Sequence, residues 1–255
     1  MDDKRYKFKL NLPGTLAVIG LLPVWWVCSM FTGGRIIPGP LVVWTRFLEL
    51  LPSTLWRHAL ASLARIGIAL FLSLLSAVPA GIAIGRSRAL DRALSPLAYL
   101  LYPVPKIALL PVVMLLFGLA DASKVTIVFL VLFFQILVTV RDAARGIPVQ
   151  YFLSMRSLGA GRLQTARFVI WPALLPQVLS ALRVGTGTSL AVLFFAETFG
   201  TRQGLGYFVM ESWMRMAYPD MYAGILALGI TGLALFLAID AVQRRVCRWH
   251  GNGPV

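Results

Sequence analysis

Charged residues are scarce in this chain, and acidic residues are the scarcer sign. Only 13% of its 255 residues are Asp, Glu, Lys or Arg, whereas soluble domains average roughly a quarter. Hydrophobic residues make up 58% of the chain, and the mean hydropathy is +0.79. The composition therefore predicts a protein that spans a membrane. A net charge of +14 would suggest a nucleic-acid partner for a soluble protein, but here we attribute it to the loops between spans and expect no nucleic acid.

The residues that build disulfides, metal sites and nucleotide sites are few or isolated. The two cysteines, Cys28 and Cys247, fall on opposite sides of the predicted membrane, so we expect no disulfide. The two histidines, His58 and His250, are just as far apart, and neither has a neighbouring nucleophile and acid. The sequence therefore predicts neither a metal site nor an enzyme. No G-x-x-x-x-G-K-[ST] run occurs, so we expect the chain itself to bind no nucleotide or other cofactor.

Carboxylates are nearly missing from the apolar part of the chain. Of the ten acidic residues, only Glu197 falls within a predicted span, near its end, and Asp240 lies at the end of another. Ion-coupled carriers normally place carboxylates near the middle of the membrane, so the scarcity favours an external source of energy. An ion-coupled secondary carrier or a structural membrane subunit is the alternative. An integral-membrane enzyme would need His, Asp or Glu clustered at one interface, and the sequence has no such cluster.

Long apolar runs divide the chain into six predicted transmembrane helices, which makes the fold class an all-α polytopic membrane protein with both termini cytoplasmic. The runs are 13–31, 58–84, 97–117, 125–140, 174–199 and 221–239. Between the first two, residues 32–56 predict an amphipathic helix in the outer interface. Pro103, Pro105 and Pro111 predict a kinked or unwound third span. This topology places 16 of the 24 Lys and Arg residues inside, beginning with the basic tail 1–12, and 6 outside, as the positive-inside rule requires.

Two finer expectations concern the second span and the loop before the fourth. Gly81 and Gly85 form a pair of small residues four positions apart, which would let two helices approach closely. Residues 118–124 are expected to form an outer loop that ends with Lys124.

The basic stretch at 141–183, between the fourth and fifth spans, carries the most information about function. It contains six arginines against one acid, Asp142. Residues 149–158 predict a short helix that ends at a glycine-rich turn, and residues 162–171 predict a second helix. Pro172 and Pro176 are expected to break or kink the chain where it re-enters the membrane. On composition alone, a plain loop lying on lipid headgroups is the alternative.

This stretch resembles the cytoplasmic EAA loop of ABC-transporter permeases, whose pattern is Glu-Ala-Ala, three residues, Gly, nine residues, Ile, two residues, Pro. Gly159, Val169 and Pro172 fall on the Gly, Ile and Pro positions, whereas residues 153–155 read Leu-Ser-Met instead of Glu-Ala-Ala. Other segments resemble, in the same order, the permeases of the nitrate, sulfonate, taurine and bicarbonate branch of ABC importers. These segments are 58–66, 102–124 and 196–209. Gln135 departs from that branch, which tends to have proline there.

The resemblance implies a type I ABC importer permease in a bacterial inner membrane. Residues 1–57 would precede a transmembrane domain at 58–242, with a cytoplasmic tail at 243–255. In that family two copies of the permease form the pathway, two separate ATPase subunits bind ATP, and a periplasmic or lipid-anchored binding protein delivers the solute. The expected solute is a small anion such as a sulfonate, taurine, nitrate or bicarbonate. The loop at about 141–176 would carry the coupling helix that docks into the ATPase. Its expected coupling residues are Leu153, Ser154, Met155, Arg156, Ser157, Leu158, Gly159, Ala160, Val169 and Pro172.

Polar residues inside the predicted spans are the candidates for lining the solute pathway. They are Arg65, Lys106, Gln135, Thr186, Ser189 and Glu197, with Thr188 beside them. A charge at the centre of a membrane helix costs roughly 2.5–3.5 kcal/mol on insertion scales, so Arg65 needs a partner, a cavity or an interface. Instead of lining the pathway, Arg65 could extend its charge to the membrane surface or pair with a carboxylate. Glu197 could act as a gate or form a salt bridge to Arg202. The hydroxyl and amide groups could instead bond to their own backbone or to a neighbouring helix.

Overall fold

The computed structural model describes residues 12–249, and from Gly20 onward it also describes the side chains. The basic tail up to residue 11 and His250 lie outside the described residues. Every regular element in the described part of the chain is a helix, as the predicted all-α class requires. The α-helices are α1 (Leu12–Phe31), α2 (Pro40–Leu50), α3 (Trp56–Arg86), α4 (Arg88–Leu101), α5 (Leu110–Phe117), α6 (Asp121–Gly146), α7 (Val149–Ser157), α8 (Arg162–Thr165), α9 (Trp171–Glu197), α10 (Leu205–Met214) and α11 (Tyr218–Val246). Three short segments adjoin them: the π-helices η1 (Leu51–Leu55) and η3 (Ala166–Ile170), and the 3-10 helix η2 (Lys106–Leu109).

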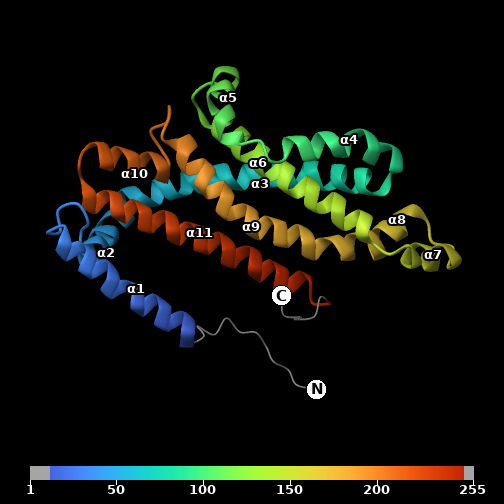
Figure 1. Ribbon diagram of the computed structural model, residues 1–255, viewed down its shortest axis with the longest axis horizontal. Helices are drawn as coiled ribbons and strands as arrows, with labels where there is room; N and C mark the ends of the chain where they lie inside the picture. The colour runs from blue at the N-terminus through green and yellow to red at the C-terminus, as the bar shows by residue number, and fades with distance from the viewer. Residues whose placement is uncertain (1–11, 250–255) are drawn as a thin grey trace.

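The long helices lie roughly along one axis, with the short helices α7 and α8 at one end of the bundle and α2 and α10 at the other (Figure 1). Four helical segments of the described chain are long and apolar enough to cross a membrane. They are Pro40–Arg86, Asp121–Gly146, Arg162–Glu197 and Tyr218–Val246. The bent pair of α4 and α5 can count as a fifth, and the described side chains of α1 are apolar from Gly20 to Phe31. Following the predicted topology, we call the end that carries α7 the inner end and the end that carries α10 the outer end.

The segment predicted as a separate interfacial helix is joined to the second span. α2, η1 and α3 form one helical segment of 47 residues. Pro52 lies in η1 and has no backbone N–H to donate, so the wider π turn carries the chain past it without ending the helix. α2 buries Val43 and Phe47, and the guanidinium of Arg46 donates to the carboxylate of Asp220 on α11 at 2.5 Å. The amphipathic pattern at 40–50 thus reflects packing against α11.

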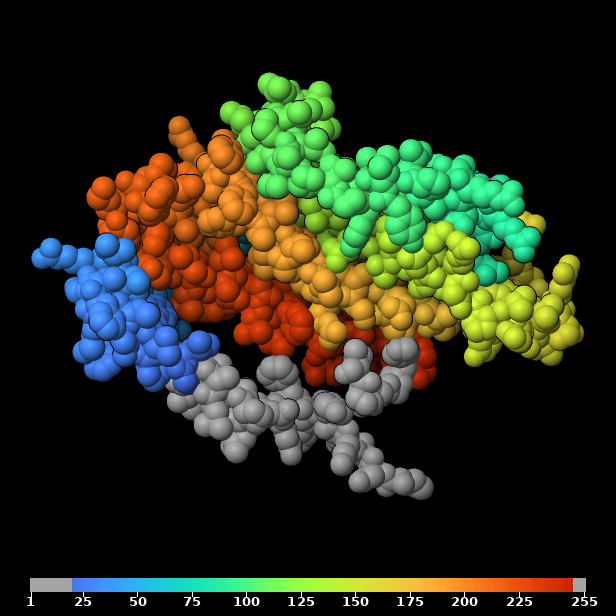
Figure 2. Space-filling model, viewed as in Figure 1, coloured from blue at the N-terminus to red at the C-terminus, as the bar shows by residue number. Residues whose placement is uncertain are grey.

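The proline-rich third span is broken, as its sequence predicts, and the break is sharp. α4 ends at Leu101, η2 and α5 follow after a gap, and the two parts meet at 83°. Prolines at positions 103 and 105 remove backbone donors and disfavour the α-conformation in the residues before them, and the helix ends there although Tyr102 itself keeps that conformation. α5 consequently stands out from the bundle (Figure 2). α4 itself begins at Arg88, earlier than the expected start at residue 97, with the Ser87 hydroxyl accepting from the backbone N–H of Leu90 at 3.4 Å.

Two predicted boundaries are wrong. The outer loop was expected to reach Lys124, but α6 begins at Asp121 and Lys124 is fully buried in its first turn. The second helix of the basic stretch was expected to end before Pro172, but α8, η3 and α9 continue without a break from Arg162 to Glu197. Pro172 is therefore in the interior of this segment, and the π turn η3 directly before it lets the helix continue past the missing N–H.

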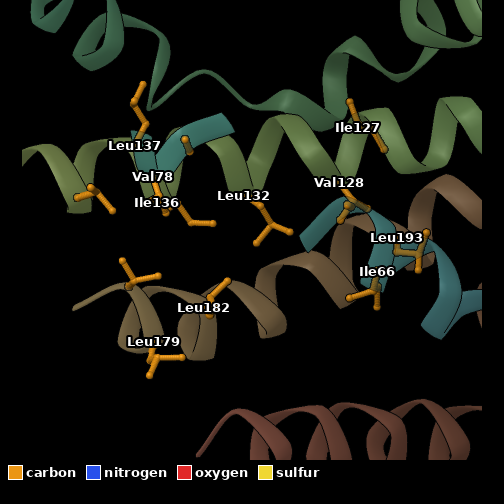
Figure 3. Packing of buried hydrophobic residues seen from close by; sticks show 14 of the residues in the cluster. Ile66, Val78, Ile127, Val128, Leu132, Ile136, Leu137, Leu179, Leu182 and Leu193 are labelled. Carbon is orange, nitrogen blue, oxygen red and sulfur yellow. The ribbon is translucent and has the colours of Figure 1, made fainter. Parts of the chain in front are cut away.

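The core lies where α3, α6 and α9 meet (Figure 3). Isoleucine, leucine and valine side chains from all three helices meet there with almost no exposed surface. Those labelled in Figure 3 are Ile66, Val78, Ile127, Val128, Leu132, Ile136, Leu137, Leu179, Leu182 and Leu193. A second, smaller cluster from α2, η1, α10 and α11 fills the outer end. The first core fixes the three helices that carry the polar residues discussed next.

The predicted close approach at Gly81 and Gly85 is confirmed, and the helix that approaches α3 is α6. A Cβ atom added at Gly81 would lie 2.8 Å from the Cβ of Val140, and one added at Gly85 would lie 2.5 Å from the carbonyl oxygen of Arg141. Both distances are shorter than a real contact, so only glycine fits at these positions.

Candidate functional site

The inner end carries a surface helix, α7, that is held on by few contacts. None of its nine residues, all of them described, is buried. Val149, Tyr151 and Leu153 are each more than half exposed, and Leu158 just beyond the helix is 80% exposed. Apolar side chains at a surface in contact with water mark an interaction site. In Figure 1 this helix and the turn after it project from one end of the bundle.

The turn after α7 has a defined geometry that depends on Gly159. Its φ of +71° is in the left-handed region, which glycine enters without strain. The N–H of Ala160 donates to the carbonyl of Met155 at 2.9 Å, and the N–H of Gly159 donates to that of Arg156 at 3.0 Å. This pair of bonds is a Schellman motif, which closes the last turn of a helix. The glycine that matches the EAA pattern therefore has a structural reason to be there.

An ionic cluster at the inner end ties α4 to α6 close to α7. Asp91 of α4 pairs with Arg141 and, at 3.0 Å, with Arg145. Arg141 also pairs with Asp142 at 2.6 Å, and the hydroxyl of Tyr99 donates to the same carboxylate at 2.7 Å. The basic stretch is thus partly neutralised by an acid about 50 positions earlier, which no local pattern could reveal.

The last contact of α7 with the bundle comes from α3. The guanidinium of Arg86 stacks over the ring of Phe152 at 3.8 Å. α7 is therefore held against the inner end of α3, while its apolar residues remain exposed.

The outer end contains a buried charge network centred on Arg65 of α3. Its guanidinium donates to Glu197 of α9 at 2.6 Å and to Asp121 of α6 at 2.6 Å. It also donates to the carbonyl of Gln203 at 2.8 Å and to the hydroxyl of Thr201 at 3.3 Å. One side chain therefore ties three helices and the loop before α10 together. Of the alternatives for Arg65, pairing with a carboxylate is what the structure shows.

Glu197 completes the network from the α9 side. Its carboxylate accepts from the Ser62 hydroxyl at 2.8 and 2.9 Å and from the backbone N–H of Gly206 at 2.9 Å. The salt-bridge alternative considered for Glu197 is therefore present, but the partner is Arg65 and not Arg202. Gly204, at φ +124°, folds directly over the carboxylate, where a Cβ atom would overlap it. The loop between α9 and α10 is shaped around this charge.

A groove on the side of the bundle, with a volume of about 460 Å³, gathers a different set of polar residues. It is bounded by the break between α4 and α5 and by the middle of α6 and α9. Lys106, Gln135, Thr188 and Tyr102 are its polar residues, and the hydroxyl of Thr188 donates to the amide oxygen of Gln135 at 3.4 Å. The rest of its wall is largely aliphatic.

The structure therefore divides the predicted pathway residues into two places. Lys106 and Gln135 line the groove, whereas Arg65 and Glu197 are enclosed in the outer network. Thr186 and Ser189 are buried, and the Thr186 hydroxyl donates to the carbonyl of Arg183 at 2.7 Å. The role of all six in solute passage stays a prediction.

A polytopic helical bundle with a largely apolar groove that carries a few polar groups, and with an exposed helix at its inner end, has the parts of a membrane transport subunit. The family profile described as "Binding-protein-dependent transport system inner membrane component" matches residues 77–249. The chain belongs to this family of transport permeases, and it is a multi-pass protein of the inner membrane.

Individual relatives place the chain more narrowly among importer permeases. The taurine transport system permease protein TauC of Escherichia coli (strain K12) is 35% identical, over 94% of this chain and 89% of TauC. The putative aliphatic sulfonates transport permease protein SsuC of Bacillus subtilis (strain 168) is 26% identical, over 98% of this chain and 90% of SsuC. A bicarbonate transport system permease protein, CmpB of Synechococcus elongatus, is also 26% identical, over 95% of this chain and 93% of CmpB.

Solved structures show the same fold. A chain of the MetNI methionine ABC transporter in an inward-facing conformation superposes with a TM-score of 0.64 at 21% identity, covering 78% of this chain and 98% of that one. A chain of a bacterial alginate ABC transporter, in complex with an alginate-bound periplasmic protein, gives 0.65 at 15% identity, covering 96% and 99%. The type I ABC importer permease fold expected from the sequence is confirmed.

Proposed function

We propose that two copies of this chain form the pathway of an importer for a small oxyanion, and that a pair of separate ATPase subunits drives it by binding α7. The observation that carries the proposal is the exposed apolar surface of α7, closed by the Schellman motif at Gly159. A soluble motor needs such a surface on the cytoplasmic side of a membrane subunit. ATP would bind to the motor, and a periplasmic or lipid-anchored binding protein would deliver the solute at the outer end.

Three of the relatives support the solute class. Their names concern taurine, aliphatic sulfonates and bicarbonate, whose solutes share an oxyanion group. A groove with an ammonium group on its wall is compatible with that class. In a single copy of the chain this groove is open on one side, so a second copy would be needed to enclose the solute.

Two substitutions at one position test the coupling role of α7. Valine at Gly159 is strained at φ +71°, whereas asparagine tolerates this conformation. We expect Gly159→Val to reduce co-purification with the cognate ABC ATPase, and solute-stimulated ATP hydrolysis, by on the order of ten-fold, which corresponds to about 1–2 kcal/mol for a β-carbon in the left-handed region. Gly159→Asn should retain most of both.

Membrane insertion and yield of the permease are measured in parallel, so that misfolding is distinguished from lost docking. If both variants bind the ATPase as the unsubstituted protein does, α7 is not the docking element. If the unsubstituted protein recovers no ATPase and takes up solute under an ion gradient alone, an ion-coupled carrier replaces the importer proposal.

A further inference from the structure

The cations buried in this bundle differ in whether the protein supplies their counter-ions. Arg65 has two carboxylates, and Arg141 has two as well. Arg183 lies 3.8 Å from Asp240. Lys124 is fully enclosed and donates to the carbonyl of Leu119, within reach of the charges of the outer network.

Neither Lys106 nor Lys124 forms an ion pair with a carboxylate of the described residues, but Lys124 lies near Asp121 and Glu197, whereas Lys106 has no such neighbour and lines the groove. Only 8% of Lys106 is exposed. Its Nζ donates to the carbonyls of Leu101 at 2.6 Å and Tyr102 at 2.5 Å. The ring of Phe134 lies 4.9 Å away. An ionisable group inside a membrane protein needs compensation, and when the protein does not provide it the group marks a functional site.

The position of Lys106 follows from the broken helix. The prolines between α4 and η2 leave the last carbonyls of α4 without helical donors, and the ammonium group satisfies two of them. An ammonium group has three N–H donors. Two are used by the carbonyls of Leu101 and Tyr102, so one remains. Broken helices of this kind hold solutes near the middle of the membrane in other transporter folds.

The groove beside Lys106 fits a small solute with one polar end. Its volume of about 460 Å³ is within the roughly 300–1,000 Å³ of small-molecule sites. Gln135 and Thr188 face it from the middle of α6 and α9. The amide nitrogen of Gln135 can donate to a solute, and the Thr188 hydroxyl can do so in exchange for its bond to the carbonyl of Gly185 or to the amide oxygen of Gln135. Val131, Val184 and Val192 offer aliphatic surface to the rest of the solute. A cationic solute would meet the uncompensated ammonium and be repelled.

We propose that Lys106 determines the charge specificity of the pathway, and that its ammonium group, with the amide of Gln135 and the hydroxyl of Thr188, binds the oxyanion of the solute in transit. The proposal rests on the importer function proposed above. The solute then acts as the counter-ion that the protein omits. Substitution of Lys106 by an uncharged residue would remove this charge-assisted hydrogen bond.

Substitution of Lys106 by histidine tests the charge itself. The complete transporter, with its ATPase pair and binding protein, is reconstituted in proteoliposomes, and uptake of labelled taurine is measured from pH 5.5 to 8. Lys106→Met should lower maximal uptake by on the order of ten- to hundred-fold, as expected for a charge-assisted bond. Lys106→Arg should restore it to within about three-fold. Lys106→His should be active at pH 5.5 and lose activity as the pH rises through about 6.5, where free imidazole loses its proton.

The pH profile separates anion binding from a role in capping α4. Histidine is too short to cap the Leu101 and Tyr102 carbonyls as lysine does, so a capping role predicts low uptake by Lys106→His at every pH. Equal uptake by Lys106→Met and the unsubstituted protein would overturn the proposal. So would uptake by Lys106→His that does not change with pH, when uptake by the unsubstituted protein does not change with pH either. If the unsubstituted transporter takes up none of taurine, methanesulfonate, nitrate and bicarbonate, the oxyanion function itself fails, which is a separate result.

Discussion

Arg65 and Lys106 are both buried cations in the membrane part of the chain, and their surroundings give them different roles. Arg65 is held by carboxylates on two other helices, so it fixes structure. Lys106 is held by two carbonyls and faces a groove, so it is available to a solute. The sequence shows that both residues are unusual in a span. It does not show their partners, because Glu197 lies 132 positions from Arg65 and only the packing of α3 against α9 brings them together.

The two carboxylates on Arg65 should contribute unequally to stability. The side chain of Glu197 is 1% exposed and that of Asp121 is 72% exposed. Loss of one partner of a buried pair costs about 3–5 kcal/mol, and loss of an exposed pair costs about 0–1 kcal/mol. We expect Glu197→Gln to lower the free energy of unfolding in detergent by on the order of 3 kcal/mol, and Asp121→Asn by about 1 kcal/mol or less. If thermal or denaturant unfolding showed that both substitutions lower the free energy of unfolding equally, the contribution of each carboxylate would not depend on its burial.

At the scale of the elements, helix order and helix type could be predicted from the sequence, whereas several boundaries could not. Apolar runs located α3, α6, α9 and α11, and glycine located the end of α7. Pro172 was expected to break or kink the chain, but the helix continues past it because a π turn lies directly before it. Lys124 was assigned to a loop because it is charged, and its burial depends on the carbonyl of Leu119. Such compensation is tertiary and leaves no local pattern.

The closeness of α3 and α6 gives a prediction with a control on the same helix. At Gly85 an added methyl group would meet the backbone of α6, whereas at Gly67 nothing lies within 4 Å. We expect Gly85→Ala to destabilise the protein by about 1–3 kcal/mol, as overpacking does. Gly67→Ala should be neutral or slightly stabilising, because alanine is the better helix former. Melting temperatures in detergent compare the two, and a similar shift in both would contradict the close approach.

For the whole molecule, the distribution of Lys and Arg predicts the orientation in the membrane, with α7 inside and the loop before α10 outside. A membrane-impermeant maleimide tests this on intact spheroplasts and on inverted vesicles, in a background that carries Cys28→Ser. Arg202→Cys, in the outer loop, should be labelled on spheroplasts, and Ser157→Cys, at the end of α7, on inverted vesicles; both replaced residues are exposed. The opposite pattern would invert the topology.

The remaining thiol gives little background in that experiment. Burial raises the pKa of the Cys247 thiol above its ordinary value. Since the thiolate is the reactive form, its labelling should be slow at pH 7 and accelerate as the pH is raised. Labelling of the background protein alone, at pH 7 and pH 9, checks this.

The unbroken helical segment from Arg162 to Glu197 also has a mechanical consequence. Its 36 residues make a rod about 54 Å long at 1.5 Å per residue. The turn that follows α7 is at one end, Thr188 is on its groove face, and Glu197 is anchored at the other end. A tilt of about 5° about that anchor displaces the free end by about 5 Å. If the segment tilted as one body about that anchor, a displacement of the turn after α7 would reach the groove wall, because no break in the helix lies between them.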